Sequence, residues 1–242
     1  MSERHSMTPA LLFDLDNTLY HFTPCDEVAV DTVRILLGQH VDVSDAEFHQ
    51  LHDRVRRQFA ERLEGQAASH NRTVFFKSML EQIVGAFRGD LAVRMADAYW
   101  NAFLGHMEPA PHAHEVLEGL AAAHELALVT NQTTYVQLTK IRRLGFERYF
   151  PVVVTSEECG IEKPAARMFE SALNGLGADA AAAVMIGDDL NCDIRGAAEM
   201  GITTIQTTEF TSARVGIGEG DRAPDAVISS MSELPEALSS LF

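Results

Sequence analysis

One stretch near the start of the chain restricts the possible folds more than any other. A short apolar run, Leu11–Phe13, leads directly into Asp14 and Asp16, and Asn17 and Thr18 follow. An uninterrupted apolar run of this length indicates a strand buried on both faces, and the polar turn-formers mark its end. In open α/β sheets, ligands bind at the carboxyl ends of the strands. Two carboxylates at one strand end repel each other unless a cation lies near them, so we predict a metal site here. An Asx turn that simply ends the strand is the alternative.

Composition and charge limit the class of partner. The chain has 242 residues, of which 46% are hydrophobic, and its formal charge is −16. This negative charge argues against nucleic acid and anionic membrane surfaces as partners. No apolar stretch reaches the roughly 18 residues of a membrane span, and residues 1–8 lack the apolar segment of a signal peptide. The three cysteines are scattered without metal-ligand spacing. We therefore expect a cytoplasmic protein with reduced thiols, whose oligomeric state, monomer or homodimer, stays open.

A helical segment follows the first strand. Between His21 and about His106 the sequence shows only helical periodicity, and Ser44 with Glu47 forms an S-x-x-E capping box. The predicted helices cover residues 26–39, residues from 44 onward, residues 73–87 and residues 91–106. Four helices of this length can bury their apolar faces against one another as a bundle. We therefore predict an inserted helical domain over residues 21–108.

After Pro111, strands alternate with helices. The predicted strands cover residues 126–130, 152–155, 183–187, 203–206 and 226–229. Strands separated by helices of about 10–15 residues form right-handed βαβ units, which produce a parallel sheet covered on both faces. The first strand must join this sheet. The predicted fold class is therefore α/β, a doubly wound parallel sheet formed by residues 1–20 and 109–242, with the helical bundle inserted between them.

Three of the later strands also end in chemically useful groups. Thr130 and Asn131 stand at the start of a predicted helix, where a hydroxyl beside free N–H groups can hold a phosphate, although simple N-capping is the alternative. Lys163 precedes Pro164 at another predicted helix start, which would hold the lysine in place. The strand at 183–187 is followed by three acids, Asp188, Asp189 and Asp193. One edge of the sheet would thus collect acids twice, a hydroxyl once and an amine once.

These residues resemble the four motifs of the haloacid dehalogenase-like (HAD) hydrolase superfamily. The matching stretches are Asp14-x-Asp16-x-Thr18, Thr130-Asn131, Lys163-Pro164 and Gly187-Asp188-x₄-Asp193. The resemblance spans nearly the whole chain, and the helical insertion is similar to the C1 cap of the subgroup I phosphatases. It implies a Rossmannoid core and a Mg²⁺-dependent phosphatase with a closing cap. The expected substrate is a small phosphorylated metabolite, such as a nucleoside monophosphate, a sugar phosphate or a phosphoglycolate-like compound.

The resemblance also implies roles for individual residues. Asp14 would attack phosphorus and form an aspartyl-phosphate, while Asp16 would protonate the leaving group and then activate water. The implied catalytic residues are Asp14, Asp16, Thr130 and Lys163. The substrate-binding candidates are Thr130, Asn131, Lys163 and His21, the last because it follows the first motif closely. The implied Mg²⁺ ligands are Asp14, Asp16 through its backbone carbonyl, Asp188 and, less directly, Asp193. The surplus of carboxylates over Lys163 would repel a phosphate dianion, which favours a divalent cation.

Three other functions stay open at this point. A 2-haloacid dehalogenase would share the fold and the nucleophile, but such relatives lack an acid at the position of Asp16 and need no metal. Asp16 and Asp188 therefore favour the phosphatase. A phosphomutase is compatible with the same motifs. A catalytically silent binding protein of this fold would show no hydrolysis of p-nitrophenyl phosphate. The physiological substrate, the cap residues that would contact the leaving group, and direct metal contact by Asp189 or Asp193 are not fixed by the sequence.

Overall fold

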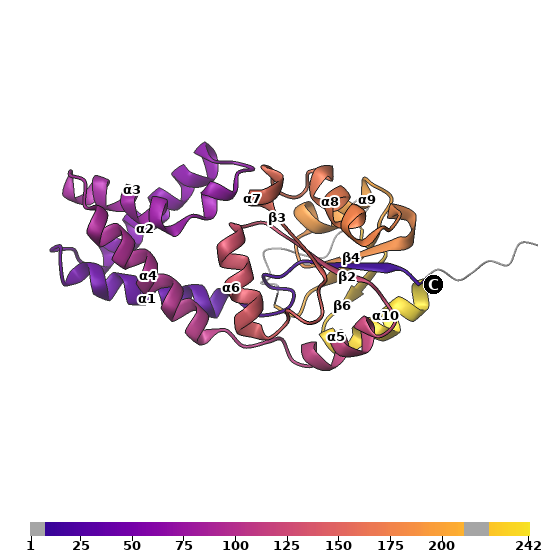
Figure 1. Ribbon diagram of the computed structural model, residues 1–242. Helices are drawn as coiled ribbons and strands as arrows, with labels where there is room; N and C mark the ends of the chain where they lie inside the picture. Colours follow the sequence, from indigo (N-terminus) through magenta and orange to yellow (C-terminus); the bar gives the residue numbers. More distant parts are fainter. Residues whose placement is uncertain (1–7, 211–222) are drawn as a thin grey trace, which may run out of the picture. The chain divides into compact units, whose positions relative to one another are not determined.

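The computed structural model describes residues 8–210 and 223–242. Residues 1–7, which the predicted core domain includes, lie outside this range. Contacts within the chain divide it into two compact units (Figure 1). The core unit comprises Met1–His21 and Glu108–Phe242, and the helical unit comprises Phe22–Met107. His21 and Glu108, which the sequence-based boundaries assign to the helical segment, belong to the core unit.

A six-stranded sheet forms the centre of the core unit, with the strands in the order β3-β2-β1-β4-β5-β6 and every neighbouring pair parallel. The strands are β1 (Ala10–Phe13), β2 (Leu126–Thr130), β3 (Val152–Thr155), β4 (Ala183–Gly187), β5 (Thr203–Thr207) and β6 (Ala226–Ile228). The predicted doubly wound parallel sheet is therefore confirmed. In its register, Phe13 stands opposite Leu128 on one side and Ile186 on the other, so β1, β2 and β4 end side by side.

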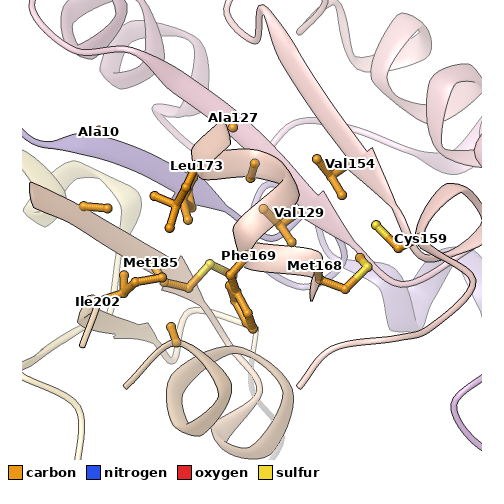
Figure 2. Close-up of a cluster of buried hydrophobic side chains, with 14 residues drawn as sticks. Ala10, Ala127, Val129, Val154, Cys159, Met168, Phe169, Leu173, Met185 and Ile202 are labelled. Carbon is orange, nitrogen blue, oxygen red and sulfur yellow. The ribbon is translucent and has the colours of Figure 1, made fainter. Parts of the chain in front are cut away.

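The central strands β1, β2 and β4 are buried on both faces, because helices cover both sides of the sheet. Figure 2 shows one such layer, in which Phe169 and Leu173 of α8 pack with Val129 and Met185 of the sheet. The helices of the core unit are α5 (Ala113–Ala121), α6 (Thr134–Leu144), α7 (Ser156–Cys159), α8 (Ala166–Leu176), α9 (Gly196–Ala198) and α10 (Leu234–Leu241). Short 3₁₀ turns add Ala180–Ala182 and Met231–Glu233.

One helix of the core unit differs from its predicted form. The sequence predicts an α-helix over residues 193–200, but a π-helical turn, Leu190–Arg195, comes first and leads into α9. The side chain of Asp189 caps this turn, because its Oδ1 accepts the N–H groups of Asn191 and Cys192 at 2.8 and 2.7 Å. The carbonyl of Asp189 also accepts from the N–H of Ile194 at 3.2 Å. The helical path therefore begins before the position that apolar periodicity indicates.

The helical unit contains α1 (Phe22–Gly38), α2 (Asp45–Arg62), α3 (Arg72–Val84) and α4 (Gly89–His106), with a 3₁₀ turn at Ala67–His70. The predicted capping box is confirmed, since Ser44 and Glu47 bond each other's backbone at the start of α2. α3 ends earlier than predicted, at Gly85, whose φ of 68° suits a glycine C-cap. Buried aromatic side chains fill this unit, among them Phe48, Phe76 and Phe103. Within the described residues, no helix is long and apolar enough to cross a membrane.

Candidate active site

The carboxyl ends of β1 and β4 bring predicted site residues into contact. The Lys163 Nζ lies 2.6 Å from Asp14 Oδ1 and 2.7 Å from Asp193 Oδ1. Carboxylate oxygens of Asp14, Asp188 and Asp193 all lie within 4.8 Å of one another. All four side chains are largely buried. Three acids and one amine from distant parts of the sequence thus form a single polar centre at the edge of the sheet.

Two glycines allow these loops to approach one another so closely. A Cβ atom at Gly187, the last residue of β4, would stand 2.2 Å from a carboxylate oxygen of Asp193. A Cβ atom at Gly196 would stand 2.9 Å from the backbone of Pro164, next to Lys163. Any side chain at either position would displace Asp193 or Lys163, so the glycines are required by the geometry of the site.

Asn131 fixes the backbone of Lys163. Its Nδ2 donates to the carbonyl of Lys163 at 3.1 Å, and its Oδ1 accepts from the N–H of Lys163 at 2.7 Å. Helix α8 begins at Ala166, so Pro164 stands before the helix rather than in its first turn. The side chain of Asn131, which the sequence suggests as a substrate contact, is thus engaged with the loop that carries Lys163.

Burial and like charges shape the electrostatics of the carboxylates. Burial, with Asp193 and Asp16 adding to it against the opposing effect of Lys163, raises the pKa of Asp14 to about 7. Burial and the neighbouring Asp14 and Asp193 raise the pKa of Asp188 to about 9. Burial alone would lower the pKa of Lys163, but the two carboxylates it contacts raise it above its ordinary value. Three carboxyl groups share the ammonium of Lys163, so ionising all of them is unfavourable unless a further cation binds.

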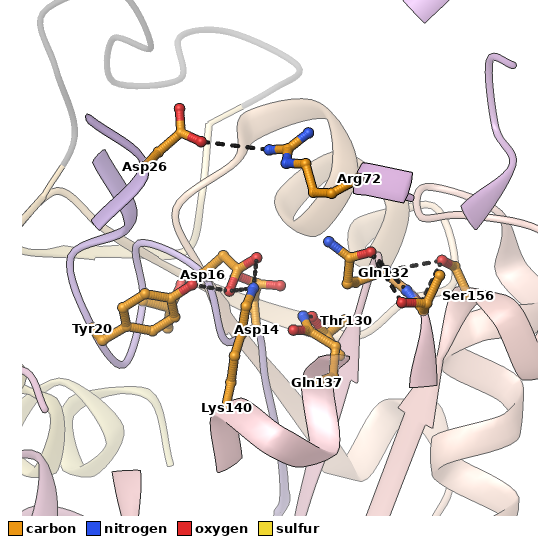
Figure 3. A network of polar contacts seen from close by, with 12 residues as sticks. Asp14, Asp16, Tyr20, Asp26, Arg72, Thr130, Gln132, Gln137, Lys140 and Ser156 are labelled. Atoms are coloured by element: carbon orange, nitrogen blue, oxygen red, sulfur yellow. Dashed lines mark hydrogen bonds and ion pairs between the residues drawn. The ribbon is translucent and has the colours of Figure 1, made fainter. Parts of the chain in front are cut away.

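Asp16 has a partner that the sequence interpretation does not include. The Lys140 Nζ, which reaches it from α6, lies 2.8 Å from Asp16 Oδ1 and 2.9 Å from Oδ2 (Figure 3). The Tyr20 hydroxyl donates to Asp16 Oδ1 at 2.6 Å. Lys140 is completely buried, whereas the side chain of Asp16 is 25% exposed. A buried cation therefore lies directly beneath the predicted acid and base.

Thr130 is likewise oriented by α6. The Gln137 Nε2 donates to Thr130 Oγ1 at 2.5 Å, so the hydroxyl of Thr130 is left to donate elsewhere (Figure 3). The buried stripe of α6 consists of Gln137, Lys140, Ile141 and Leu144. The helical spacing of these four residues is a sequence signal that Gln137 and Lys140 are buried, because both continue the apolar stripe toward the start of the helix.

The remaining predicted residues have partners of their own within the protein. His21 is exposed and stacks on Phe210, with ring centroids 4.9 Å apart. Asp189 uses its carboxylate to cap the π-helical turn. Asp193 Oδ2 accepts from the N–H of Asp189 at 3.1 Å, so both of its oxygens have protein partners. Asp193 therefore holds Lys163 and its own loop in place.

Comparisons with known proteins identify the family of the chain. The family model described as haloacid dehalogenase-like hydrolase matches residues 8–201. A ribulose-1,5-bisphosphate 5-phosphatase from Halopiger xanaduensis is 40% identical over 96% of this chain and 100% of its own. A glyceraldehyde 3-phosphate phosphatase from Methanocaldococcus jannaschii is 26% identical over 97% of this chain and 99% of its own. The crystal structure of a 2-haloacid dehalogenase from Pseudomonas syringae is similar with a TM-score of 0.75, at 29% identity over 98% of this chain and 100% of that one. The chain therefore belongs to the haloacid dehalogenase-like hydrolase family and is one of its phosphatases.

Proposed function

We propose that this phosphatase hydrolyses a small sugar phosphate through an aspartyl-phosphate intermediate, with Asp14 as nucleophile and Asp16 as acid and base. The observation that carries the proposal is the position of Lys163, whose ammonium bridges Asp14 and Asp193 with Asp188 close by. Phosphoryl transfer depends mainly on positioning and on neutralising charge around the phosphoryl group. A buried amine beside a buried carboxylate provides both at one strand end.

In the first half of the reaction, Asp14 attacks the phosphorus atom and the bond to the leaving oxygen breaks. Lys163 keeps the Asp14 oxygen in place and neutralises charge on the phosphoryl oxygens. Thr130 donates its hydroxyl to a phosphoryl oxygen, since Gln137 already occupies its acceptor side. Asp16 gives a proton to the leaving oxygen and then takes one from the water that cleaves the aspartyl-phosphate.

The carboxylate cluster fits a Mg²⁺ ion. Asp14 and Asp188 would hold it through carboxylate oxygens, with the backbone carbonyl of Asp16 as a further ligand, because Mg²⁺ prefers hard oxygen ligands. Asp193, whose oxygens bond Lys163 and the N–H of Asp189, would support the site indirectly. When bound, the ion supplies the positive charge that an anionic substrate needs among these acids.

Two further roles belong to the same proposal. The helical unit acts as a cap; it begins at Phe22, directly after the segment that carries Asp14 and Asp16. His21 contacts the substrate from the rim, together with the Phe210 ring on which it stacks. A cap of this kind excludes water and favours small substrates over macromolecules.

The relatives indicate which sugar phosphates to examine first. The relative with 40% identity over its entire length is named for ribulose 1,5-bisphosphate, and several others are named for glyceraldehyde 3-phosphate. We propose ribulose 1,5-bisphosphate as the preferred substrate of the two. Both are primary alkyl phosphates, whose poor leaving groups call for an acid such as Asp16.

The test measures phosphate release by the full-length protein from ribulose 1,5-bisphosphate, glyceraldehyde 3-phosphate and p-nitrophenyl phosphate, with Mg²⁺ or with excess EDTA. We expect Mg²⁺-dependent hydrolysis, a kcat/KM for the bisphosphate at least about tenfold above that for the triose phosphate, and loss of activity in Asp14→Asn. Full turnover of the metal-free protein in EDTA would contradict the metal assignment.

A parallel measurement covers the dehalogenase that the similar crystal structure represents. Chloride release from chloroacetate should stay at background, because this chain has Asp16 and Asp188, whereas dehalogenase relatives lack an acid at the position of Asp16 and need no metal. Chloride release that is lost in Asp14→Asn, without phosphate release from any ester, would replace the phosphatase with a dehalogenase.

A further inference from the structure

Helix α6 places two polar side chains where an amphipathic helix normally buries apolar ones. Gln137 and Lys140 have no exposed surface, and they share the buried stripe with Ile141 and Leu144. Burying an ammonium group is costly unless the charge is paired and hydrogen-bonded. A leucine or methionine at position 140 would complete the stripe without that cost. The ammonium of Lys140 therefore needs an explanation in terms of what it contacts.

We propose that Lys140 is a positioning residue for the reaction, which holds Asp16 in place and stabilises the carboxylate that forms when Asp16 gives up its proton. The inference rests on the proposed function, in which Asp16 is the acid and base. Lys140 contacts both oxygens of Asp16, at 2.8 and 2.9 Å, so it fixes the plane of the carboxylate as well as its distance.

Tyr20 completes the support of Asp16. Its hydroxyl bonds Asp16 Oδ1 at 2.6 Å, and the Lys140 ammonium lies 5.6 Å from the centre of its ring. Asp16 Oδ1 thus accepts two hydrogen bonds, from Tyr20 and from Lys140, whereas Asp16 Oδ2 accepts one from the described residues, that of Lys140. This arrangement leaves Oδ2 as the oxygen that exchanges the proton.

The Asp14 oxygen forms a bond to phosphorus while the bond between phosphorus and the ester oxygen breaks, and the electron pair of that bond stays on the ester oxygen. The proton on Asp16 Oδ2 moves to this oxygen and leaves a carboxylate beside Lys140. Because the ammonium is already buried beneath Asp16, no reorganisation is needed when the negative charge appears.

The test compares Lys140→Met with a matched control, Arg142→Met, which removes one positive charge from an exposed position of the same helix. Each variant is assayed on p-nitrophenyl phosphate, whose leaving group departs without a proton, and on ribulose 1,5-bisphosphate or glyceraldehyde 3-phosphate, whichever the wild type hydrolyses faster. The measured quantity is kcat/KM, which includes departure of the leaving group.

For Lys140→Met we expect a fall of about 100-fold on the alkyl phosphate and less than about fivefold on p-nitrophenyl phosphate, since acid–base catalysis contributes about 10²–10⁴. Arg142→Met should match the wild type on both. A variant that only lowers the amount of folded enzyme would lose both activities in proportion, and that result would overturn the proposal, as would no loss at all.

If Lys140→Met does not fold, Tyr20→Phe decides the question, because it keeps the ring and removes the bond to Asp16. It should lower kcat/KM about three- to tenfold on the alkyl phosphate alone, as expected for one hydrogen bond. Equal losses on both substrates would again overturn the proposal. A wild type without any phosphatase activity would instead count against the proposed function, so the two failures are distinguishable.

Discussion

The strongest test of the described charge centre is Lys163→Met, which removes the ammonium and keeps most of the side-chain volume. Lys163 contacts Asp14 at 2.6 Å and Asp193 at 2.7 Å, and its side chain is 2% exposed. Removing one partner of a buried ion pair leaves an uncompensated charge and costs about 3–5 kcal/mol. In a chain of this size, 1 kcal/mol corresponds to about 2–4 °C, so we expect Tm to fall by about 6–20 °C.

The loss should depend on pH and on metal. Burial raises the pKa of Asp14 to about 7, and it also raises that of Asp193. At pH 5 these carboxyls can hold protons, which removes the unpaired charge, so Lys163→Met should be less destabilising at pH 5 than at pH 8. Mg²⁺ at saturation should restore part of the stability at pH 8, because a second cation then neutralises the same carboxylates.

Circular dichroism and fluorescence together show whether the core unit or the helical unit loses thermal stability in Lys163→Met. The single tryptophan, Trp100, lies in α4 of the helical unit, so its fluorescence follows that unit, whereas far-ultraviolet circular dichroism follows both. Arg142→Met serves as the exposed control on charge removal. A Tm within about 2 °C of the wild type at both pH values corresponds to a cost of less than about 1 kcal/mol. Such a result for Lys163→Met would refute the ion pairs of Lys163 with Asp14 and Asp193.

Three further predictions concern other parts of the chain. Gln137→Leu removes a buried Oε1 that lacks a hydrogen-bond partner among the described residues, so Tm should hardly change. The same variant removes the hydrogen bond from Gln137 Nε2 to Thr130, so KM for the phosphate ester should rise about two- to tenfold. In the metal-free protein, the free energy of unfolding should fall as pH rises from about 4, because folded Asp14 and Asp188 hold protons that the unfolded chain releases near pH 3.8. The fall due to Asp14 should end above about pH 7 and that due to Asp188 above about pH 9, whereas thermal melts with excess Mg²⁺ at the same pH values should lack it. Ser44→Ala should cost about 1 kcal/mol by loss of the α2 cap, visible as a lower midpoint of the Trp100 fluorescence melt.

The sequence predicts the sheet and the principal acids well because both follow from local patterns. Short apolar runs end in polar residues at the end of β1, β2 and β4, and parallel strands necessarily present those ends at one edge. Gly145 and Gly177 likewise mark the ends of α6 and α8, where each has the positive φ that favours a glycine.

The contacts of the supporting residues are not predictable in the same way, because the tertiary structure decides what a buried side chain meets. The apolar stripe of α6 includes position 140, but nothing within α6 alone indicates that Lys140 faces Asp16. Asp189 illustrates the reverse case. Its position beside Asp188 suggests a further metal ligand, yet its carboxylate bonds the backbone N–H groups of its own turn.

The central position of β1 has a consequence for the order in which the chain can fold. β1 is synthesised well before the strands that flank it, and β2 is the earlier of the two, since Leu11 pairs with Leu126. At about 5–20 residues per second, the intervening stretch takes roughly 6–22 s to synthesise. The helical unit has its own internal contacts, in which α1 packs against α4, so it can form during that delay and bring the two ends of the interrupted core together. A nascent chain that stops before β2 therefore exposes an unpaired apolar strand to chaperones.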